Sequence, residues 1–462
     1  MNNHWRMSAP HTDTIAAIAT APGEGAIAIV RLSGPTSLTI ADAIFKGKAP
    51  PPSQRPAQSF VHGSIINANK LADEVILLIY RSPHSYTRED AVEIQGHGGA
   101  AAAKRILRTV LEAGARMAEP GEFTQRAFLS GRIDLLQAEA VLDLIRARSD
   151  RAADAALEQL TGTLSKDFDR LYDHTLSLAA NLETTLDFSE DELPDSIMQN
   201  IIARSHDVEA EFKRLLSSWD EGHLLREGAL VVISGKPNVG KSTLLNALVG
   251  KERAIVTPIA GTTRDTIEEQ IVINGFLVRI IDTAGLRETP CEIEKEGVSR
   301  AFKAITNSDC NIYVVDGTIG IDDSDIATIK KLNQNKLVIA INKYDEIILQ
   351  TDETKKTNWS HLFISAKNGI GIDALKQEII NILGVKGGSP PHATISERHR
   401  HLLVSAHKDV VEAGLLLIRP TPEPALAASR LRGALETLGE VTGRTYHDEL
   451  LNNIFSRFCI GK

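Results

Sequence analysis

The chain has 462 residues, of which 42% are hydrophobic and 24% are charged, a balance that is typical of several folded domains and excludes a disordered chain. Its formal net charge of −9 predicts repulsion of polyanions, so contact with a nucleic acid would need a local basic patch. Its three cysteines are far apart and include no CxxC pair, which argues against a disulfide framework and against a zinc site.

Strands and one helix are predicted in the first part of the chain. Short apolar runs bounded by Gly or Pro predict strands at 14–20, 25–34, 74–80 and 91–95. Apolar residues at helical spacing predict a helix that begins near residue 100 and ends near Gly114. We therefore predict that residues 1–130 form a small α+β domain.

The rest of the chain changes pattern twice. Residues 131–224 and 389–462 carry apolar residues at helical spacing, which predicts long helices. Residues 225–388 alternate buried strands with helical stretches, which predicts a doubly wound parallel sheet with its ligand at the carboxyl ends of the strands. Because the flanking helices need one another to bury their apolar stripes, we expect a discontinuous helical-bundle domain with an inserted α/β domain.

The segment GKPNVGKS, from Gly235 to Ser242, follows a predicted strand and precedes a predicted helix. In this context the glycines let backbone N–H groups turn towards phosphate oxygens, at a helix N-terminus that favours anions. Lys241 is expected to reach the β- and γ-phosphate oxygens, and the hydroxyl of Ser242 is expected to bind Mg²⁺. The segment therefore predicts a P-loop.

Three further groups are expected around the metal and the γ-phosphate. Thr262 and Thr263 in GTTRD can supply a hydroxyl to Mg²⁺, and Asp282 in DTAG ends a strand as an acid behind the metal. Gly285 can offer its N–H to the γ-phosphate. These motifs follow the P-loop in the order that a GTP-binding domain requires.

The base is predicted from NKYD and SAK. Asp345 can pair with the N1 and N2 hydrogens of guanine, and the segment from Ser365 to Lys367 can close over the base. Adenine would leave Asp345, which is expected to be partly buried, without donors, and this is unfavourable. The predicted nucleotide is therefore GTP.

The sequence departs from Ras-type enzymes at Leu286, where those enzymes carry the Gln that orients the attacking water. Asn238 could hold a monovalent cation that neutralises developing charge on the phosphates, or it could only stabilise the loop. Glu294 could orient the water, or it could be an ordinary solvated glutamate. The residues alone leave both alternatives open.

Together these elements resemble the translation-factor-like branch of the small GTPases. PNVGKS and GTTRD also occur in ribosome-assembly GTPases of the Era and Der kind, so a ribosome-assembly switch is the alternative function. Over nearly the whole chain, however, the sequence resembles the MnmE (TrmE) family of tRNA-modification GTPases. The resemblance rests on an inserted G domain and on APGEGAIAIVRLSG, SYTREDAVEIQGHGG, RMAEPGEFTQRAFLSGRIDLLQAEAV and the ending FCIGK.

The resemblance implies a GTP-hydrolysing enzyme that acts with the flavoprotein MnmG, as a heterotetramer. The pair would add an aminomethyl or carboxymethylaminomethyl group to C5 of the wobble uridine of certain tRNAs. It also implies a homodimer joined by the N-terminal domains, and 5-formyltetrahydrofolate or 5,10-methylenetetrahydrofolate bound there. The inserted domain would be Ras-like, and two copies would dimerise face to face with K⁺.

Residue by residue, the resemblance implies Mg²⁺ at Ser242 and Thr263 and catalysis by Glu294. K⁺ would be held by Asn238, Thr257, Ile259 and Thr262. The predicted nucleotide-binding residues are Asn238, Val239, Gly240, Lys241, Ser242, Thr243, Thr257, Ile259, Gly261, Thr262, Thr263, Asp282, Thr283, Ala284, Gly285, Asn342, Lys343, Asp345, Ser365, Ala366 and Lys367.

For folate, the resemblance implies Arg31, Glu93, Arg132 and Lys462, which pair a carboxylate for the pterin with cations for the glutamate tail. Taken singly, each could instead be an ordinary surface or structural charge. Arg132 stands where the family is expected to carry a lysine, so the charge is kept but the geometry differs.

Cys459, three residues from the end of the sequence as given, has three possible roles. A prenyl anchor is disfavoured because CIGK lacks a suitable last residue. In addition, the sequence has no run of about 18 apolar residues, which a membrane-spanning helix would need. A buried inert thiol is the second possibility. We favour the third, a catalytic thiolate that adds to the uracil ring, and we expect a cytoplasmic protein.

Overall fold

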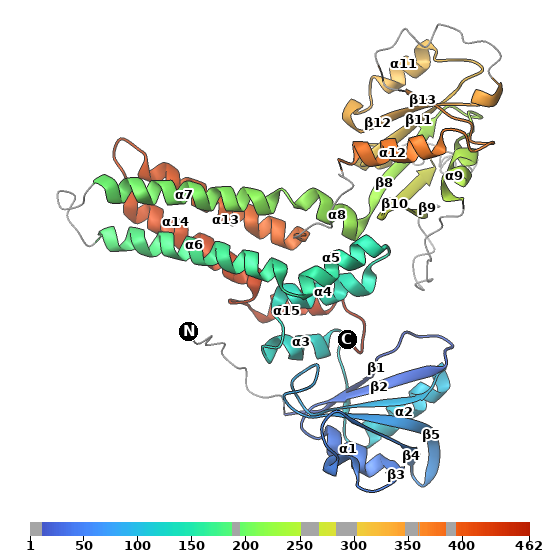
Figure 1. Ribbon diagram of the computed structural model, residues 1–462, viewed down its shortest axis with the longest axis vertical. Coiled ribbons are helices and arrows are strands. Elements are labelled where there is room, and N and C mark those ends of the chain that lie inside the picture. Colours follow the sequence, from blue (N-terminus) through green and yellow to red (C-terminus); the bar gives the residue numbers. More distant parts are fainter. Residues whose placement is uncertain are drawn as a thin grey trace, which may run out of the picture. The chain divides into compact units, whose positions relative to one another are not determined.

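The computed structural model describes residues 12–186, 195–250, 268–282, 303–346, 359, 361–384 and 394–462. These residues form two compact units. The first takes its residues from 1–142, 159–212 and 401–462, and the second takes its residues from 143–158 and 213–400. Figure 1 labels most of the helices and strands of both units.

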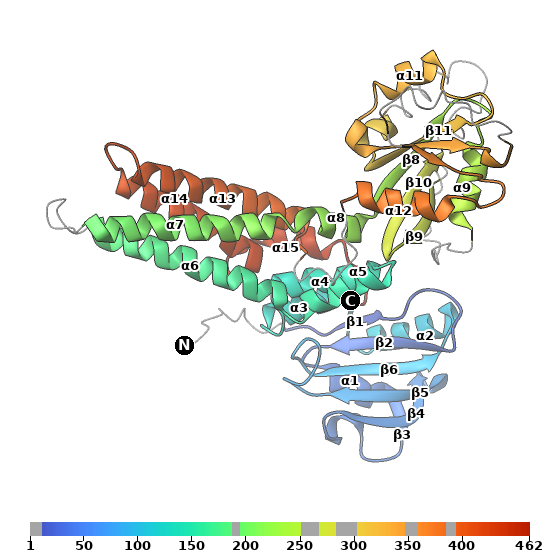
Figure 2. The ribbon, with the colours of Figure 1, turned by 45° about the horizontal axis from the view of Figure 1, so that its top comes forward.

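The first unit begins with a seven-stranded sheet in the order β3-β4-β5-β6-β2-β1-β7 (Figure 2). Neighbouring strands are antiparallel except for β1 and β7, which are parallel. The strands are β1 Ile15–Ile18, β2 Ile27–Ser33, β3 Phe45–Gly47, β4 Ser59–Asn67, β5 Lys70–Tyr80, β6 Ala91–His97 and β7 Arg116–Met117.

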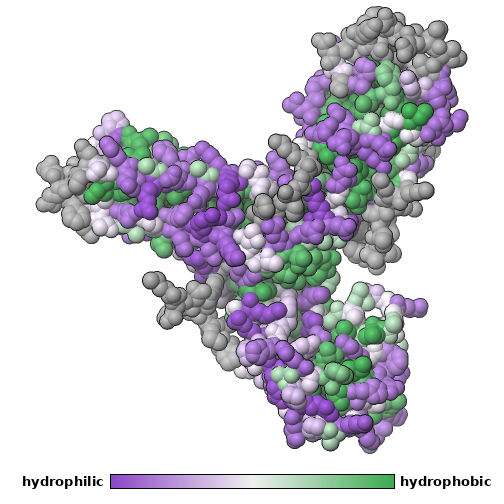
Figure 3. All heavy atoms as spheres, in the orientation of Figure 1, coloured by the Kyte–Doolittle hydropathy of each residue, from purple (hydrophilic) through white to green (hydrophobic). Residues whose placement is uncertain are grey.

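Helices α1 (Ser37–Ile44) and α2 (Ala100–Glu112) cover one face of this sheet. Alternate strand residues such as Val30, Leu32 and Ile94 point into a core that also holds Ile106 of α2. The strand residues between them point to the opposite face, and the surface of this domain that is visible in Figure 3 mixes hydrophobic and hydrophilic residues.

Helices of the first unit build a bundle around four long members, α6, α7, α13 and α14, which lie side by side in both ribbon views. The face of the bundle in Figure 3 is mainly hydrophilic, as expected of amphipathic helices that bury one stripe. The helices that lie wholly or mainly in this unit are α3 Glu122–Leu129, α4 Leu135–Arg146, α6 Thr163–Leu186, α7 Asp195–Leu216, α13 Glu397–Leu417, α14 Pro424–Thr442 and α15 Asp448–Phe455.

The second unit contains a six-stranded sheet in the order β13-β12-β11-β8-β10-β9. All neighbours are parallel except β9, which pairs antiparallel with β10 at the edge. The strands are β8 Ala229–Gly235, β9 Glu268–Ile273, β10 Phe276–Asp282, β11 Cys310–Asp316, β12 Leu337–Asn342 and β13 His361–Phe363. The helices are α5 Asp150–Leu160, α8 Trp219–Glu227, α9 Lys241–Val249, α11 Asp323–Ile329 and α12 Ile372–Ile382.

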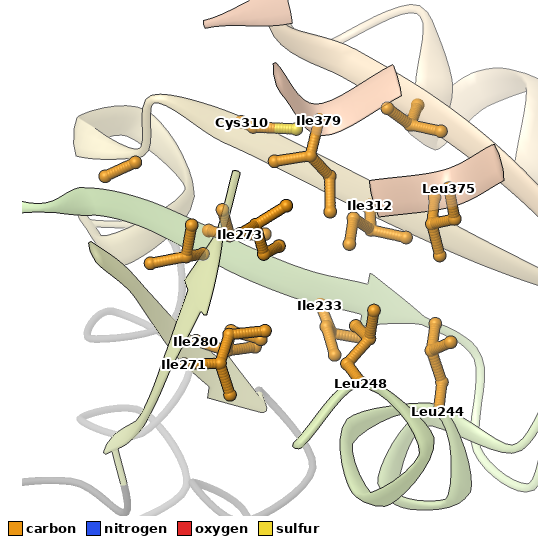
Figure 4. Packing of buried hydrophobic residues seen from close by; sticks show 14 of the residues in the cluster. Ile233, Leu244, Leu248, Ile271, Ile273, Ile280, Cys310, Ile312, Leu375 and Ile379 are labelled. Atoms are coloured by element: carbon orange, nitrogen blue, oxygen red, sulfur yellow. The ribbon is translucent and has the colours of Figure 1, made fainter. Parts of the chain in front are cut away.

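The core of this sheet explains why the strand runs are uniformly apolar. Ile233 and Ile312 of the parallel strands pack with Leu244 of α9 and with Leu375 and Ile379 of α12 (Figure 4). A parallel sheet covered by helices buries both sides of each strand, so its strands carry few polar positions.

The predicted fold class is confirmed: an α+β domain, helices on both sides of an insertion, and a Ras-like α/β domain. Strand β4, helix α1 and the antiparallel edge strand β9 were not predicted. None of the described helices is both long and apolar enough to cross a bilayer.

Candidate functional site

The P-loop joins β8 to α9, and two glycines give it its shape. Gly235 has φ of +139°, and a Cβ there would lie 2.4 Å from the carbonyl oxygen of Val314. Gly240, the N-cap of α9, has φ of +96°, and a Cβ there would lie 2.3 Å from Nδ2 of Asn342. Because no side chain fits either position, both glycines are required by close packing.

The side chains predicted to meet the phosphates and Mg²⁺ lie at the start of α9. The ammonium of Lys241 donates to the carbonyl oxygen of Lys236 at 2.6 Å, which folds it back over the loop. The hydroxyl of Ser242 donates to Oδ2 of Asp282 at 2.8 Å. The structure therefore brings together the hydroxyl and the acid that fit a Mg²⁺ site, with Thr243 exposed beside them.

Asn342 joins the P-loop to the base-binding segments. Its Nδ2 donates to the carbonyl oxygen of Val239 at 2.9 Å, and its Oδ1 accepts from the backbone N–H of Ala366 at 3.0 Å. NKYD and SAK, predicted from separate motifs, are thus held against one another. The amide of Asn342 provides the connection at 3% exposure.

The acid expected to read guanine is poised to accept hydrogen bonds, although it is exposed rather than partly buried as expected. A hydrogen bond with Ser365 lowers the pKa of Asp345 below its ordinary value, with a smaller contribution from the charge of Lys367. Lys343 donates to Oδ2 of Asp316 at 2.5 Å, which fixes the residue two positions before Asp345. An ionised carboxylate at this place suits the two donors on the guanine edge.

Part of the predicted site lies outside the described residues: Thr257, Ile259, Gly261, Thr262, Thr263, Thr283, Ala284, Gly285 and Glu294. Of the predicted K⁺ ligands only Asn238 is described, and it is exposed with φ of +64°. K⁺ binding and the role of Glu294 remain predictions.

The N-terminal domain holds a cavity of about 530 Å³ that contains three of the four residues predicted for folate, Arg31, Glu93 and Arg132. Nε of Arg31 donates to Oε1 of Glu93 at 2.8 Å. Both contacts that Glu93 accepts from Arg31 end on Oε1, which leaves Oε2 able to accept from a ligand.

Aromatic rings complete the cavity wall. The guanidinium of Arg132 lies 4.7 Å from the ring centre of Tyr86 and donates to its carbonyl oxygen at 3.1 Å. Arg31 lies 5.7 Å from the rings of both Tyr86 and Phe123. Two aromatic rings beside one carboxylate, in a lining that is otherwise mainly polar, suit a pterin, so the residues present fit the folate prediction. Sequence reasoning missed these aromatic residues, although both lie within the motifs SYTRED and GEFTQ.

A buried ionic network lies behind this cavity, and it too was not predicted. Ser33, a lining residue, donates to Oε2 of Glu89 at 2.6 Å. Arg126, which is 1% exposed, donates to Glu89 at 3.1 Å, to Oδ1 of Asp13 at 2.9 Å and to Oε1 of Glu122 at 2.9 Å. The network ties the cavity wall to helix α3 and to the segment before β1.

The C-terminal residues pack against the N-terminal domain. Ile460 forms an isolated antiparallel bridge with Pro120, and a Cβ on Gly461 would lie 2.4 Å from the carbonyl oxygen of Ile18. Lys462 is not among the lining residues of the cavity described above. Cys459 is exposed, so the interpretation as a buried inert thiol is wrong.

Comparison with known proteins gives matches over nearly the full length. Residues 14–132 match the family model described as the GTP-binding protein TrmE N-terminus, and residues 135–459 match that of the MnmE helical domain. A protein of Moorella thermoacetica named tRNA modification GTPase MnmE is 44% identical, covering 97% of this chain and 99% of the relative. A protein of the same name from Desulforamulus reducens is 42% identical with the same coverage.

Among solved structures, this chain is similar to Era from Aquifex aeolicus bound to GDP·AlF₄⁻. The matched region covers 42% of this chain and 69% of the Era chain. The identity is 26% and the TM-score 0.28. The two relatives named MnmE span 97% of this chain at 42–44% identity, and the family model of the MnmE helical domain matches more than half of it. The chain belongs to the MnmE family of tRNA modification GTPases.

Proposed function

We propose that this chain hydrolyses GTP in order to modify C5 of the wobble uridine of certain tRNAs, acting with a flavoprotein of the MnmG type. A tetrahydrofolate carrying a formyl or methylene group, when bound in the N-terminal domain, would supply the one-carbon unit. The observation that carries the proposal is the cavity in which Arg31, Glu93 and Arg132 meet two aromatic side chains.

In the G domain, each described residue has a defined task. Lys241 would neutralise charge on the β- and γ-phosphates, and Ser242 with Asp282 behind it would hold Mg²⁺. Asp345 would accept the guanine N1 and N2 hydrogens, which selects GTP over ATP. Water orientation is assigned to Glu294, and K⁺ to Asn238 with Thr257, Ile259 and Thr262.

In the cavity, Oε2 of Glu93 would accept hydrogen bonds from the pterin edge, while Tyr86 and Phe123 would exclude water from its faces. Arg132 would attract the carboxylates of the glutamate tail, and stacking on Tyr86 holds its guanidinium in place. Lys462 would join the site only after movement of the C-terminal residues or from a second copy.

A homodimer is supported by the apolar residues on the second face of the N-terminal sheet. Ile27, Phe60 and Ile76 are exposed by 59%, 75% and 40% on the face opposite α1 and α2. Cross-strand register places Arg31 and Glu93 on the same face, because they lie opposite one another on β2 and β6. A second copy docked there would bury apolar surface and would cover the cavity at the same time.

The exposed thiol of Cys459 is assigned to the tRNA step. A thiolate that adds to the uracil ring would make C5 nucleophilic, and its elimination would restore the ring. Replacing Cys459 with Ser should abolish tRNA modification and leave GTP hydrolysis intact. Retention of modification in this variant would contradict the assignment.

Mass spectrometry of tRNA nucleosides tests the proposal as a whole. We expect modified uridine only when the chain, an MnmG-type flavoprotein, GTP and the folate are all present. Formation of the product without folate, or with Glu93→Gln at the wild-type rate, would contradict the folate part. A separate comparison of GTP turnover in KCl and NaCl tests the K⁺ part, and equal rates would contradict it.

A further inference from the structure

A salt-bridge cluster ties the P-loop to helix α11. The ammonium of Lys236, the second residue of GKPNVGKS, donates to Oδ2 of Asp322 at 2.6 Å and to Oδ2 of Asp325 at 2.9 Å. Asp322 is the N-cap of α11, where its side chain accepts from the backbone N–H groups of Ser324 and Asp325. The Asp322 carboxylate that binds Lys236 is therefore itself held in place by a capping box.

Asp325 is a buried carboxylate whose positive partner is Lys236. Its side chain is 5% exposed, and its Oδ1 accepts from the hydroxyl of Tyr313 on β11 at 2.8 Å. Within the described residues, Lys236 is the one cation within salt-bridge distance of Asp325. A buried carboxylate left without its cation is strongly unfavourable, so the pair holds the Lys236 side chain in one place.

The backbone of Lys236 serves the nucleotide site directly. Its carbonyl oxygen accepts the hydrogen bond from the ammonium of Lys241 at 2.6 Å. On one side stands Gly235, which has no room for a Cβ, and on the other stands Pro237, whose ring fixes φ. The carbonyl that orients Lys241 thus belongs to Lys236, whose side chain is held by salt bridges and whose two neighbours in the chain have restricted conformations.

We propose that Lys236 is a positioning residue for Lys241: its salt bridges to Asp322 and Asp325 hold the carbonyl that aims the Lys241 ammonium at the phosphates. The inference rests on the proposed role of Lys241 at the β- and γ-phosphates. It assigns a task in nucleotide binding to a side chain that would not itself touch the nucleotide.

The test is a double-mutant cycle on the full-length chain, read out as equilibrium affinity for GDP and for GMP. Lys236→Met keeps the unbranched shape and most of the length of the side chain and removes its charge. We expect it to weaken GDP binding about tenfold, since one charged hydrogen bond is lost from its optimal geometry. GMP binding should be unchanged, because GMP has no β-phosphate. Lys236→Arg should restore GDP affinity, and Asp325→Asn should resemble Lys236→Met.

The background variant Lys241→Ala separates positioning from a general structural role. In that background Lys236→Met should produce no further loss of GDP affinity, because the group through which it acts is absent. Lys330→Met, an exposed lysine just after α11, is the matched control and should change nothing.

Two results would overturn the inference: equal losses for GMP and GDP in Lys236→Met, or the same tenfold loss in the presence and absence of Lys241. If Lys241→Ala alone left GDP affinity unchanged, the phosphate role of Lys241 would fall instead. The two failures are therefore distinguishable.

Discussion

Replacing Arg126 with Met tests whether the buried ionic network supports the cavity of the N-terminal domain. Arg126 is 1% exposed and donates to three carboxylates, those of Asp13, Glu89 and Glu122. Removing one partner of a buried ionic group costs about 3–5 kcal/mol when the remaining charge stays buried. Here Glu122 and Glu89 are 7% and 18% exposed at their side chains, whereas Asp13 is 42% exposed and stays hydrated. Arg116 continues to bind Glu122, at 2.8 Å and 2.5 Å, so we expect the lower end, about 3 kcal/mol.

Amide hydrogen exchange, followed by mass spectrometry, measures this loss within the N-terminal domain. Peptides from β2 and α3 should exchange faster by a factor that corresponds to about 3 kcal/mol, roughly a hundredfold. Because Ser33 lines the cavity and donates to Glu89, folate affinity should fall as well, while GTP hydrolysis should be unchanged. The matched control is Arg108→Met, since Arg108 is 67% exposed at its side chain. Exchange no faster than in that control would refute the reasoning.

The same network predicts how the stability of the domain depends on pH. Burial raises the pKa of Glu122, but hydrogen bonds from Arg116, the backbone of Glu119 and Arg126 outweigh burial and hold it below its ordinary value of 4.5. A depressed folded-state pKa contributes stability above the unfolded value and loses it as pH falls. Protection of α3 should therefore decrease below about pH 4.5, and this decrease should be smaller in Arg126→Met.

Three further predictions concern single groups. Asp345→Asn should weaken GTP binding roughly 10- to 100-fold through loss of the charged acceptor, and binding of xanthosine triphosphate should improve; unchanged GTP affinity would contradict the base assignment. A hydrogen bond with Asp73 raises the pKa of His97 above 6.5, so its contribution to stability is present below that value and lost as pH rises through the raised pKa. NMR titration should give a lower His97 pKa in Asp73→Asn, and an equal one would refute the pairing. Cys459 should react with a small thiol reagent in the native chain, because it is exposed, and Cys310, which is buried, should not.

The juxtaposition of the described P-loop, NKYD and SAK segments could be predicted from sequence because they are short motifs at strand ends. Gly235 ends one strand, and Gly240 and Lys241 follow it within six residues, so all three belong to one short motif. NKYD follows another strand of the same parallel sheet. The carboxyl ends of parallel strands meet at one edge, so motif order alone placed these side chains together.

The network behind the cavity could not be predicted in this way. Arg126 and Asp13 lie 113 positions apart, and a buried arginine on α3 has the same sequence pattern as a solvated one. Tyr86, in the loop after β5, and Phe123, in α3, line the cavity because the fold brings both rings next to Arg31. Contacts of this kind depend on tertiary packing rather than on local periodicity.

The antiparallel strand β9 shows a third limit. It pairs with β10 through a short turn at Asn274 and Gly275, so it is an edge strand in an otherwise parallel sheet. Its sequence EEQIVI has apolar residues on only part of its length, whereas the central strands are largely apolar. Reading for buried runs therefore found the centre of the sheet and missed the edge strand β9.

Equilibrium binding of 5-formyltetrahydrofolate to the full-length chain tests the central claim most directly. The account predicts saturable binding to the wild type and marked weakening in both Glu93→Gln and Arg132→Ala, with GTP affinity unchanged in all three proteins. Absence of binding to the wild type, or equal affinity in the wild type and both variants, would contradict it.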